Sequence, residues 1–157
     1  MALTLPNLSS VEISIPALLD VAQCDREIAR VITVIDTHLA AGQDVLAYTS
    51  REVVTGDNGN ASLHIGQRIS SAIVRIVRGL RQIPAWCIAK GGITASDIAT
   101  FGLDVRRARV LGQAIPGVPI WRTGDHSRWP RRVYVVFPGN VGDIGALADM
   151  IRVLRGH

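Results

Sequence analysis

The sequence predicts a single α/β domain, a layered α/β/α fold built around a largely parallel central sheet. Two observations lead to this prediction. Short, continuous apolar segments alternate with amphipathic segments in which apolar residues recur at helical spacing. The chain of 157 residues is also 48% hydrophobic and only 19% charged, which describes an ordered domain with a core of its own. Because no internal repeat or domain boundary stands out, we expect residues 1–157 to form one domain.

The first half of the chain provides two expected strands and two expected helices. In the segment 24–41, apolar residues recur at spacings of three and four, which predicts a helix that ends at Gly42. A second amphipathic helix follows a turn-rich segment that we expect to be a mobile loop. In chain order, the expected elements are a strand or arm at 11–16, the helix at 24–41, a buried strand at 44–50, the loop at 52–61 and the helix at 62–80.

The second half continues the alternation and contains the clearest strand, VYVVF. A long polar stretch, RTGDHSRWPRR, precedes that strand and is expected to be exposed. The expected elements are a strand at 84–90, a short helix at 95–101, extended segments at 107–115 and 118–124, the strand at 133–137 and a closing helix at 143–155. Strands that alternate with helices are typical of a parallel sheet, because each helix returns the chain to the same edge.

The charge and cysteine content narrow the classes of partner. All but one of the 17 basic residues are arginine, and they are scattered along the chain, with few aromatic residues among them. The net charge of +4 fits a solvated surface, or a positive site for a phosphorylated small molecule, better than a nucleic-acid interface. We therefore expect no nucleic acid as a partner. No apolar stretch reaches the length of a membrane span, so we expect no membrane as a partner either. Cys24 and Cys87 form no CxxC pair, and we expect both to be reduced thiols in a cytoplasmic protein.

Two glycine-containing turns follow expected strands and lead into expected helices. They are Lys90-Gly91-Gly92-Ile93-Thr94 and Pro138-Gly139-Asn140-Val141-Gly142-Asp143. Glycine lets the backbone approach an anion closely, and the free amides at the start of a helix point toward it. In α/β sheets, ligands bind beyond the carboxyl ends of the strands, so both turns are candidate phosphate sites. Lys90, the only lysine in the chain, can add a positive charge to such a site.

Each turn also has a purely structural interpretation. A glycine pair between a strand and a helix is often only a tight turn, and Thr94 with Asp97 matches a helix capping box. Asn140 or Asp143 can likewise cap the closing helix. The first turn is not a Walker loop, because the order and spacing of its glycines and lysine differ from that motif. The pattern alone leaves the binding and the structural interpretations open.

Three segments in a fixed order suggest a family. IAKGGITASDIATFGL, RRARVLGQAIPGVPIWRTG and VVFPGNVGD resemble the C-terminal nucleotide-binding domain of the four-carbon acid sugar kinases, also known as domain of unknown function 1537. The resemblance covers nearly the whole chain, from Val11 to Leu154. It implies ATP-dependent phosphorylation of a small sugar acid such as threonate, erythronate or an oxo-tetronate. These kinases hold the sugar acid in an N-terminal domain, which we expect to lie outside this chain.

The resemblance also implies which residues contact the nucleotide. The contacts carry over to Gly91, Gly92, Ile93, Thr94 and Gly139, and we extend them by inference to Lys90 and Asn140. Mg²⁺ is expected to bridge phosphate oxygens, with Asp97 or Asp143 as outer-shell ligands, although capping is the favoured role of both aspartates. No residue is assigned as catalytic or as a direct metal ligand, because the general base is expected in the missing domain. The chain alone is therefore expected to show little or no kinase activity.

A non-catalytic interaction module is the alternative function. In that case the nucleotide site is vestigial, and an apolar surface that once faced the substrate domain mediates self-association into a homo-oligomer. The four histidines lie far apart without metal-ligand spacing, and Ser70-Ser71 lacks the context of a catalytic serine. Trp121 is a candidate to line the nucleotide cleft, whereas Trp86 is expected to pack in the core.

Overall fold

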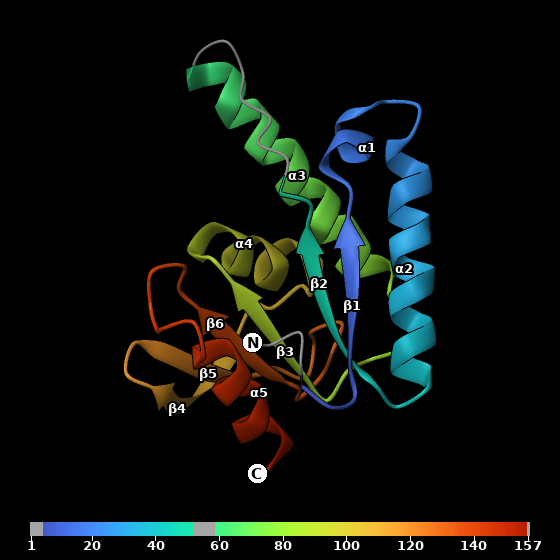
Figure 1. The fold of residues 1–157 in the computed structure, drawn as a ribbon. Helices are drawn as coiled ribbons and strands as arrows, with labels where there is room; N and C mark the ends of the chain where they lie inside the picture. The colour runs from blue at the N-terminus through green and yellow to red at the C-terminus, as the bar shows by residue number, and fades with distance from the viewer. Residues whose placement is uncertain (1–4, 52–58, 157) are drawn as a thin grey trace. The chain divides into compact units, whose positions relative to one another are not determined.

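The computed structural model describes residues 5–51 and 59–156. Strands and helices alternate in these ranges, which confirms the α/β class (Figure 1). The chain forms two compact units, one spanning Asn7–Gln82 and the other Ile83–His157 together with Met1–Pro6. Each unit has its own sheet, of two strands in the first and four in the second. The expected loop at 52–61 lies mostly outside the described residues.

The unit Asn7–Gln82 combines a parallel pair of strands with three helices. Its elements are β1 (Leu8–Ile13), α1 (Ile15–Leu19), α2 (Cys24–Ala40), β2 (Asp44–Thr49) and α3 (Gly59–Gly79). Both expected helices and the expected strand at 44–50 are confirmed, with ends that differ by a few residues. The strand at 44–50 is only half-buried, because Ala47 and Tyr48 are exposed and its other residues are partly covered.

Local signals set the ends of these elements. β1 ends earlier than expected, because the hydroxyl oxygen of Ser14 accepts a hydrogen bond from the amide of Ala17 at 3.3 Å and begins α1. Pro16, in the first turn of α1, lacks an amide hydrogen that the helix does not need there. Gly42 follows α2 with a φ of 74°, a conformation that glycine adopts without steric cost, so the expected end of this helix is confirmed.

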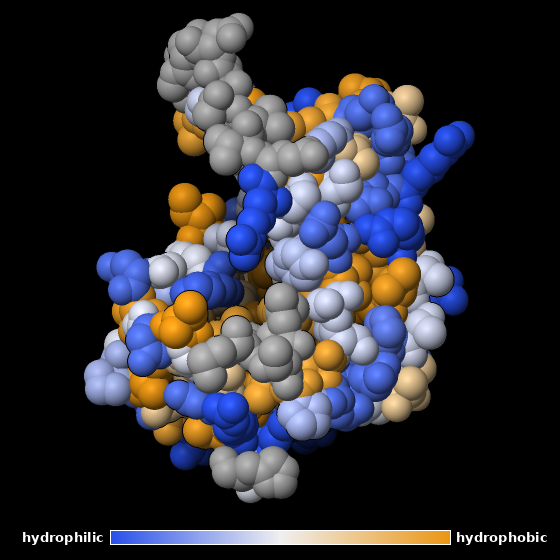
Figure 2. Space-filling view, in the orientation of Figure 1, coloured by the Kyte–Doolittle hydropathy of each residue, from blue (hydrophilic) through white to orange (hydrophobic). Residues whose placement is uncertain are grey.

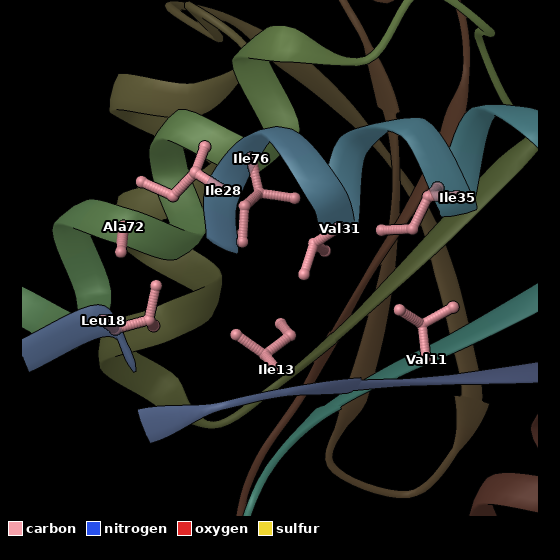
Figure 3. Close-up of a cluster of buried hydrophobic side chains, with 8 residues drawn as sticks. All are labelled: Val11, Ile13, Leu18, Ile28, Val31, Ile35, Ala72 and Ile76. Atoms are coloured by element: carbon pink, nitrogen blue, oxygen red, sulfur yellow. The ribbon is translucent and has the colours of Figure 1, made fainter. Parts of the chain in front are cut away.

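Apolar side chains from four elements form the core of this unit (Figure 3). The cluster consists of Val11, Ile13, Leu18, Ile28, Val31, Ile35, Ala72 and Ile76. On α2, the buried residues Ile28, Val31 and Ile35 recur at spacings of three and four and face β1. The periodicity in the sequence therefore identified the buried face of α2 correctly.

The unit that begins at Ile83 is built around a mixed sheet with the strand order β3-β6-β5-β4. Its elements are β3 (Trp86–Lys90), α4 (Gly92–Asp97), the π-helical segment η2 (Ile98–Gly102), β4 (Ala108–Ile115), β5 (Val118–Thr123), β6 (Val133–Phe137) and α5 (Ala146–Arg155). β3 and β6 are parallel, whereas β5 is antiparallel to both β6 and β4. The prediction of a largely parallel sheet is therefore wrong.

A two-residue turn explains the antiparallel pairing of β4 and β5. Pro116 and Gly117 connect the two strands, and Gly117 has a φ of 83°. A connection this short reverses the chain and cannot hold the crossover that a parallel pair requires. β4 also carries two irregularities in its register with β5, and Gly112 at one of them has a φ of 137°.

The connection from β5 to β6 is better packed than its polar composition predicts. Trp129 is 4% exposed, and Ser127 is also buried. The hydroxyl of Thr123 donates to the carbonyl oxygen of Trp129 at 2.5 Å, and the hydroxyl of Ser127 donates to the same oxygen at 2.8 Å. These bonds fold the connection onto itself, so the expectation of an exposed loop is wrong for its central residues.

Helices pack against both faces of this sheet. Val135 and Phe137 of β6 lie in one apolar cluster with Ala146 and Met150 of α5. Tyr134 directly precedes Val135 in β6, so it points to the opposite face. Its hydroxyl donates to the carbonyl oxygen of Ala95 in α4 at 2.7 Å. Within this unit, α4 and α5 therefore cover opposite faces of the sheet.

The surface carries no helix that would suit a lipid bilayer: in the part of the chain that the structure describes, none is both long and apolar enough to cross one. Hydrophilic residues occupy several separate patches of the face shown in Figure 2, with hydrophobic residues between them. Both cysteines are free thiols, as expected.

Candidate functional site

The two glycine turns leave the same edge of the four-stranded sheet. β3 ends at Lys90 and β6 ends at Phe137, and these two residues are partners in the parallel register. Because parallel neighbours end on the same side, the turns that follow them begin next to each other. The expectation that both turns face the same way, which the sequence could only suggest, agrees with this geometry.

Lys90 connects the two turns directly. Its ammonium group donates to the carbonyl oxygens of Pro138 and Gly139, at 3.3 Å in each case. The same nitrogen lies 4.5 Å from the centre of the Phe137 ring, which adds a cation–π contact. The side chain is exposed, so the positive charge stays at the surface between the turns.

The first turn passes straight from β3 into α4. Gly91 has a φ of 104°, and its amide donates to the carbonyl oxygen of Phe137 at 2.8 Å. α4 begins at Gly92, so the amides of Gly92, Ile93 and Thr94 belong to its first turn, where a helix supplies no acceptor. Thr94 lies inside the helix, and no side chain caps it, so the expected capping box is wrong. The helix begins earlier than expected because Gly91 can adopt the conformation that precedes it.

The fold itself does not require glycine at Gly92 or Gly139. A Cβ atom added at either position would meet nothing within 4 Å, and neither residue has a positive φ. Gly91 and Gly142, by contrast, have φ values of 104° and 80° and need glycine for the backbone. Space beside Gly92 and Gly139 is what a close approach of a ligand to the backbone requires.

The second turn does not lead directly into its helix. α5 begins at Ala146, six residues beyond Asn140, so Asn140 does not cap it. One carboxylate oxygen of Asp143 accepts from the amide of Gly145 at 2.8 Å, which adds an extra turn before the helix. The expected helix start at 143 is therefore wrong. Gly139 and Asn140 are exposed loop residues close to Lys90.

A hollow of about 440 Å³ opens beside Gly92 and is lined by α4 and η2 together with residues of β4, β5 and β6. Its apolar lining includes Ala99, Val105, Val110, Trp121 and Val136. Trp121 therefore lines this hollow, and its expected place in a nucleotide cleft stays a prediction. Trp121 also stacks on Tyr134, with ring centres 6.1 Å apart.

The polar lining of this hollow was missed by reasoning from the sequence. It consists of the hydroxyl residues Ser96 and Thr100, from α4 and η2, and of Arg106 and Arg107, which precede β4. The adjacent arginines are visible in the sequence as a pair, but their position beside Gly92 depends on how the chain returns from η2 to β4. The π-helical turn of η2 contributes to the same wall, and such turns are frequent at functional sites.

Two titratable side chains lie side by side on the strands that precede the turns. Cys87 of β3 pairs in register with Tyr134 of β6. Burial raises the pKa of the Cys87 thiol to about 12. Burial also raises the pKa of Tyr134, and the neighbouring Cys87 adds to that shift. Both groups are therefore protonated at neutral pH, and Cys87 is not a reactive nucleophile.

A second hollow, of about 340 Å³, lies in the unit Asn7–Gln82. Its basic residues include Arg68 and Arg75 of α3. Both are engaged: Arg68 donates to the carbonyl oxygen of Leu19 at 2.8 Å, and Arg75 pairs with Asp25 at 2.7 Å. Over the described ranges, no three histidine, cysteine or acidic side chains gather as a metal site.

Comparisons with known proteins give the family. Residues 2–147 match the model of the nucleotide-binding C-terminal domain. Two crystal forms of a protein from Bordetella bronchiseptica are similar in fold, with TM-scores of 0.61 and 0.66 at 19% identity. That protein is described as a domain of unknown function (DUF1537) with bound citrate, in a domain-swapped dimer.

The similarity covers 94% of this chain but only 33% and 35% of the two solved chains, so this chain spans about one third of their length. No curated protein matches it. The family model and the solved structures confirm the resemblance that the three sequence segments indicate. The chain belongs to the family of nucleotide-binding C-terminal domains found in DUF1537 proteins.

Proposed function

We propose that this chain is the ATP-binding part of a kinase that phosphorylates four-carbon sugar acids of the threonate, erythronate or oxo-tetronate type. The observation that carries the proposal is the parallel pairing of β3 with β6, since it brings two glycine turns to one edge of a sheet. Membership of a nucleotide-binding family supports the choice of ligand. The sugar acid would bind to a part of the protein outside these 157 residues.

The phosphates would lie between the two turns. The first-turn amides of Gly92, Ile93 and Thr94 donate to phosphate oxygens on one side, and Gly139 with Asn140 contacts them on the other. Lys90 already spans the turns, and its ammonium group adds a positive charge between them. The residues at this edge therefore hold and orient the phosphates, which is most of what phosphoryl transfer requires of a protein.

ATP, when bound, supplies the phosphoryl group, and Mg²⁺ neutralises part of the charge that develops on it. Because the described residues contain no cluster of metal-binding side chains, phosphate oxygens and water would supply the ligands of the metal. Asp97 or Asp143 would act in its outer shell, through water. The side chain of Asp143 also shapes the second turn by accepting from the amide of Gly145.

Replacing the two unconstrained glycines tests this site. We expect Gly92→Val and Gly139→Val each to weaken the binding of Mg-ATP by about tenfold or more, because the new side chain fills the space that the phosphates need. Gly66→Val is a matched control, since Gly66 also has free space around it but lies on α3. Titration of a fluorescent ATP analogue measures all four proteins. Unchanged affinity in both site variants would reject the site.

We further propose that this chain alone has little or no kinase activity, because none of its residues is assigned as the base for the sugar hydroxyl. Incubating the purified chain with Mg-ATP and four-carbon acids, and measuring ADP release, tests this. Steady turnover of such an acid by the 157 residues would contradict it.

An interaction module with a vestigial nucleotide site is the second candidate. Exposed apolar side chains favour it, since Ile93 is 78% exposed and Ile144 is 88% exposed next to the two turns. On this view the chain forms a homo-oligomer, as the related Bordetella protein does through domain swapping. A rise in melting temperature with Mg-ATP supports the nucleotide site, whereas self-association without any such rise favours the interaction module.

A further inference from the structure

Two arginines that belong to neither glycine turn line the hollow beside Gly92. Arg106 and Arg107 line it, and both side chains are exposed. Neither guanidinium group forms an ion pair or hydrogen bond with any other residue that the structure describes, although the backbone carbonyl oxygen of Arg107 accepts from the amide of Gly124. Two arginine side chains that line one hollow without a counter-charge give it a positive potential, so the hollow is suited to an anionic ligand.

The turns alone provide little positive charge for a triphosphate. Lys90 is the only cationic side chain in them, and its ammonium group already contacts two carbonyl oxygens and the ring of Phe137. Backbone amides add partial charges only. A nucleoside triphosphate carries several negative charges, so further cations close to Gly92 would balance it better than the turns can.

The hollow has the size and lining of a small-molecule site. Its volume of about 440 Å³ is in the range of ligand pockets, and apolar side chains dominate its floor. Ser96 of α4 and Thr100 of η2 add hydroxyl groups to its lining. Gly92 belongs to both the hollow and the first turn, so one ligand can occupy the two together.

We infer that Arg106 and Arg107 bind the phosphate groups of the nucleotide, so that the site prefers the charged nucleotide to an uncharged nucleoside. This inference rests on the proposed function and adds specificity residues to the same site. Arginine suits the role because its planar group donates two parallel hydrogen bonds to a phosphate. The arginines act on the charged part of the nucleotide and leave the nucleoside to the apolar floor.

The test compares ATP, inorganic tripolyphosphate and adenosine, by calorimetric titration of the full chain. Arg106→Gln and Arg107→Gln are each expected to weaken the binding of ATP and of tripolyphosphate by about tenfold. Adenosine binding is expected to change by less than about threefold, since it lacks the phosphates. The affinity of the double variant for ATP should also depend less on salt concentration than that of the wild type.

Arg109→Gln is the matched control, because Arg109 is an exposed arginine of β4 that does not line the hollow. Arg106→Lys is expected to recover part of the lost ATP affinity, because it restores the charge without the planar geometry. Circular dichroism and thermal unfolding show whether each variant is folded, which we expect for exposed positions.

The outcomes separate the two proposals. If the wild type binds ATP, Gly92→Val does not, and the arginine variants bind like Arg109→Gln, the inference is overturned and the proposed function stands. Equal losses for ATP and adenosine would also overturn it, because the arginines would then contact the nucleoside. A wild type that binds neither ATP nor tripolyphosphate would overturn both proposals.

Discussion

The buried thiol of Cys87 makes the stability of the chain depend on pH in a predictable direction. The pKa of this thiol is raised from 9.0 to about 12 by burial. Because the folded pKa is the higher one, the folded chain keeps a proton that the unfolded chain loses. The stabilisation is therefore complete below pH 9.0 and declines as the pH rises toward 12.

The size of the effect follows from the same shift. Each pH unit in this range lowers the free energy of unfolding by about 1.4 kcal/mol, because one pKa unit corresponds to that energy. Cys87 keeps some exposed surface, and water there weakens the effect of burial on the thiol. We therefore expect the free energy of unfolding to fall by at least about 1 kcal/mol per pH unit. Between about pH 9 and about pH 10.5, the loss due to Cys87 is therefore about 1.5 to 2 kcal/mol.

Urea unfolding of the wild type and of Cys87→Ala, followed by circular dichroism from about pH 8 to about pH 10.5, measures the effect. The variant lacks the thiol, so the free energy of unfolding of the wild type should fall relative to that of the variant as the pH rises. Cys24→Ala is the control and is expected to keep the slope of the wild type. Parallel curves for the wild type and Cys87→Ala would refute the reasoning.

Three further substitutions test the packing around both sheets. Tyr134→Phe removes the hydrogen bond to Ala95, so it should lower the free energy of unfolding by about 1 kcal/mol and speed amide exchange in α4. Glu27→Gln should lower the free energy of unfolding by about 1 to 3 kcal/mol at pH 7, because hydrogen bonds from Arg30 and from a backbone amide hold the pKa of Glu27 below 4.5. The difference from the wild type should shrink as the pH falls below 4.5, since Glu27 then becomes protonated. Gly142→Ala should cost about 1 to 3 kcal/mol, because its φ is 80° and the added Cβ would collide with a helix residue.

Two of these substitutions have a control in the chain. Asp25→Asn breaks an exposed ion pair on the same helix as Glu27 and should cost less than about 0.5 kcal/mol. A similar cost for both carboxylates, in urea titrations, would contradict the role given to Glu27. Gly139→Ala should leave the melting temperature unchanged, and a loss as large as that of Gly142→Ala would contradict the distinction between the two glycines. If amide exchange in α4 is the same in Tyr134→Phe as in the wild type, the hydrogen bond from Tyr134 does not stabilise α4.

The sequence predicted the elements of the fold better than the way they pair. Apolar periodicity identified α2 and its buried face, and the continuous apolar run identified β6, because both signals are local. Strand direction is not local, so alternating elements led to the expectation of a parallel sheet. Pro116 and Gly117 were the available signal for a hairpin, since a two-residue connection allows only antiparallel strands.

The candidate site, too, could be predicted from the sequence only where the signal is local. The two glycine turns could be found because strand ends and glycines are visible in the sequence, and the structure brings both turns to one edge. The start of each helix was misjudged, because Gly91 and Asp143 shape the backbone through φ and a local hydrogen bond that composition does not reveal. Arg106 and Arg107 could not be assigned to a site, because their nearness to Gly92 arises only from the tertiary fold.

The register between β3 and β6 has a consequence for the order of events in folding. β3 pairs with β6 from Trp86 and Val133 onward, and Lys90 donates to the carbonyl oxygen of Pro138, which follows β6. A nascent chain that ends before β6 therefore contains the first turn but not the acceptor of this hydrogen bond. Contacts between residues so distant in the chain tend to form late, because a long loop must close first. A nucleotide that requires both turns can then recognise only the finished product of synthesis. We therefore expect it to prolong the lifetime of the native state and to leave the rate of its formation unchanged.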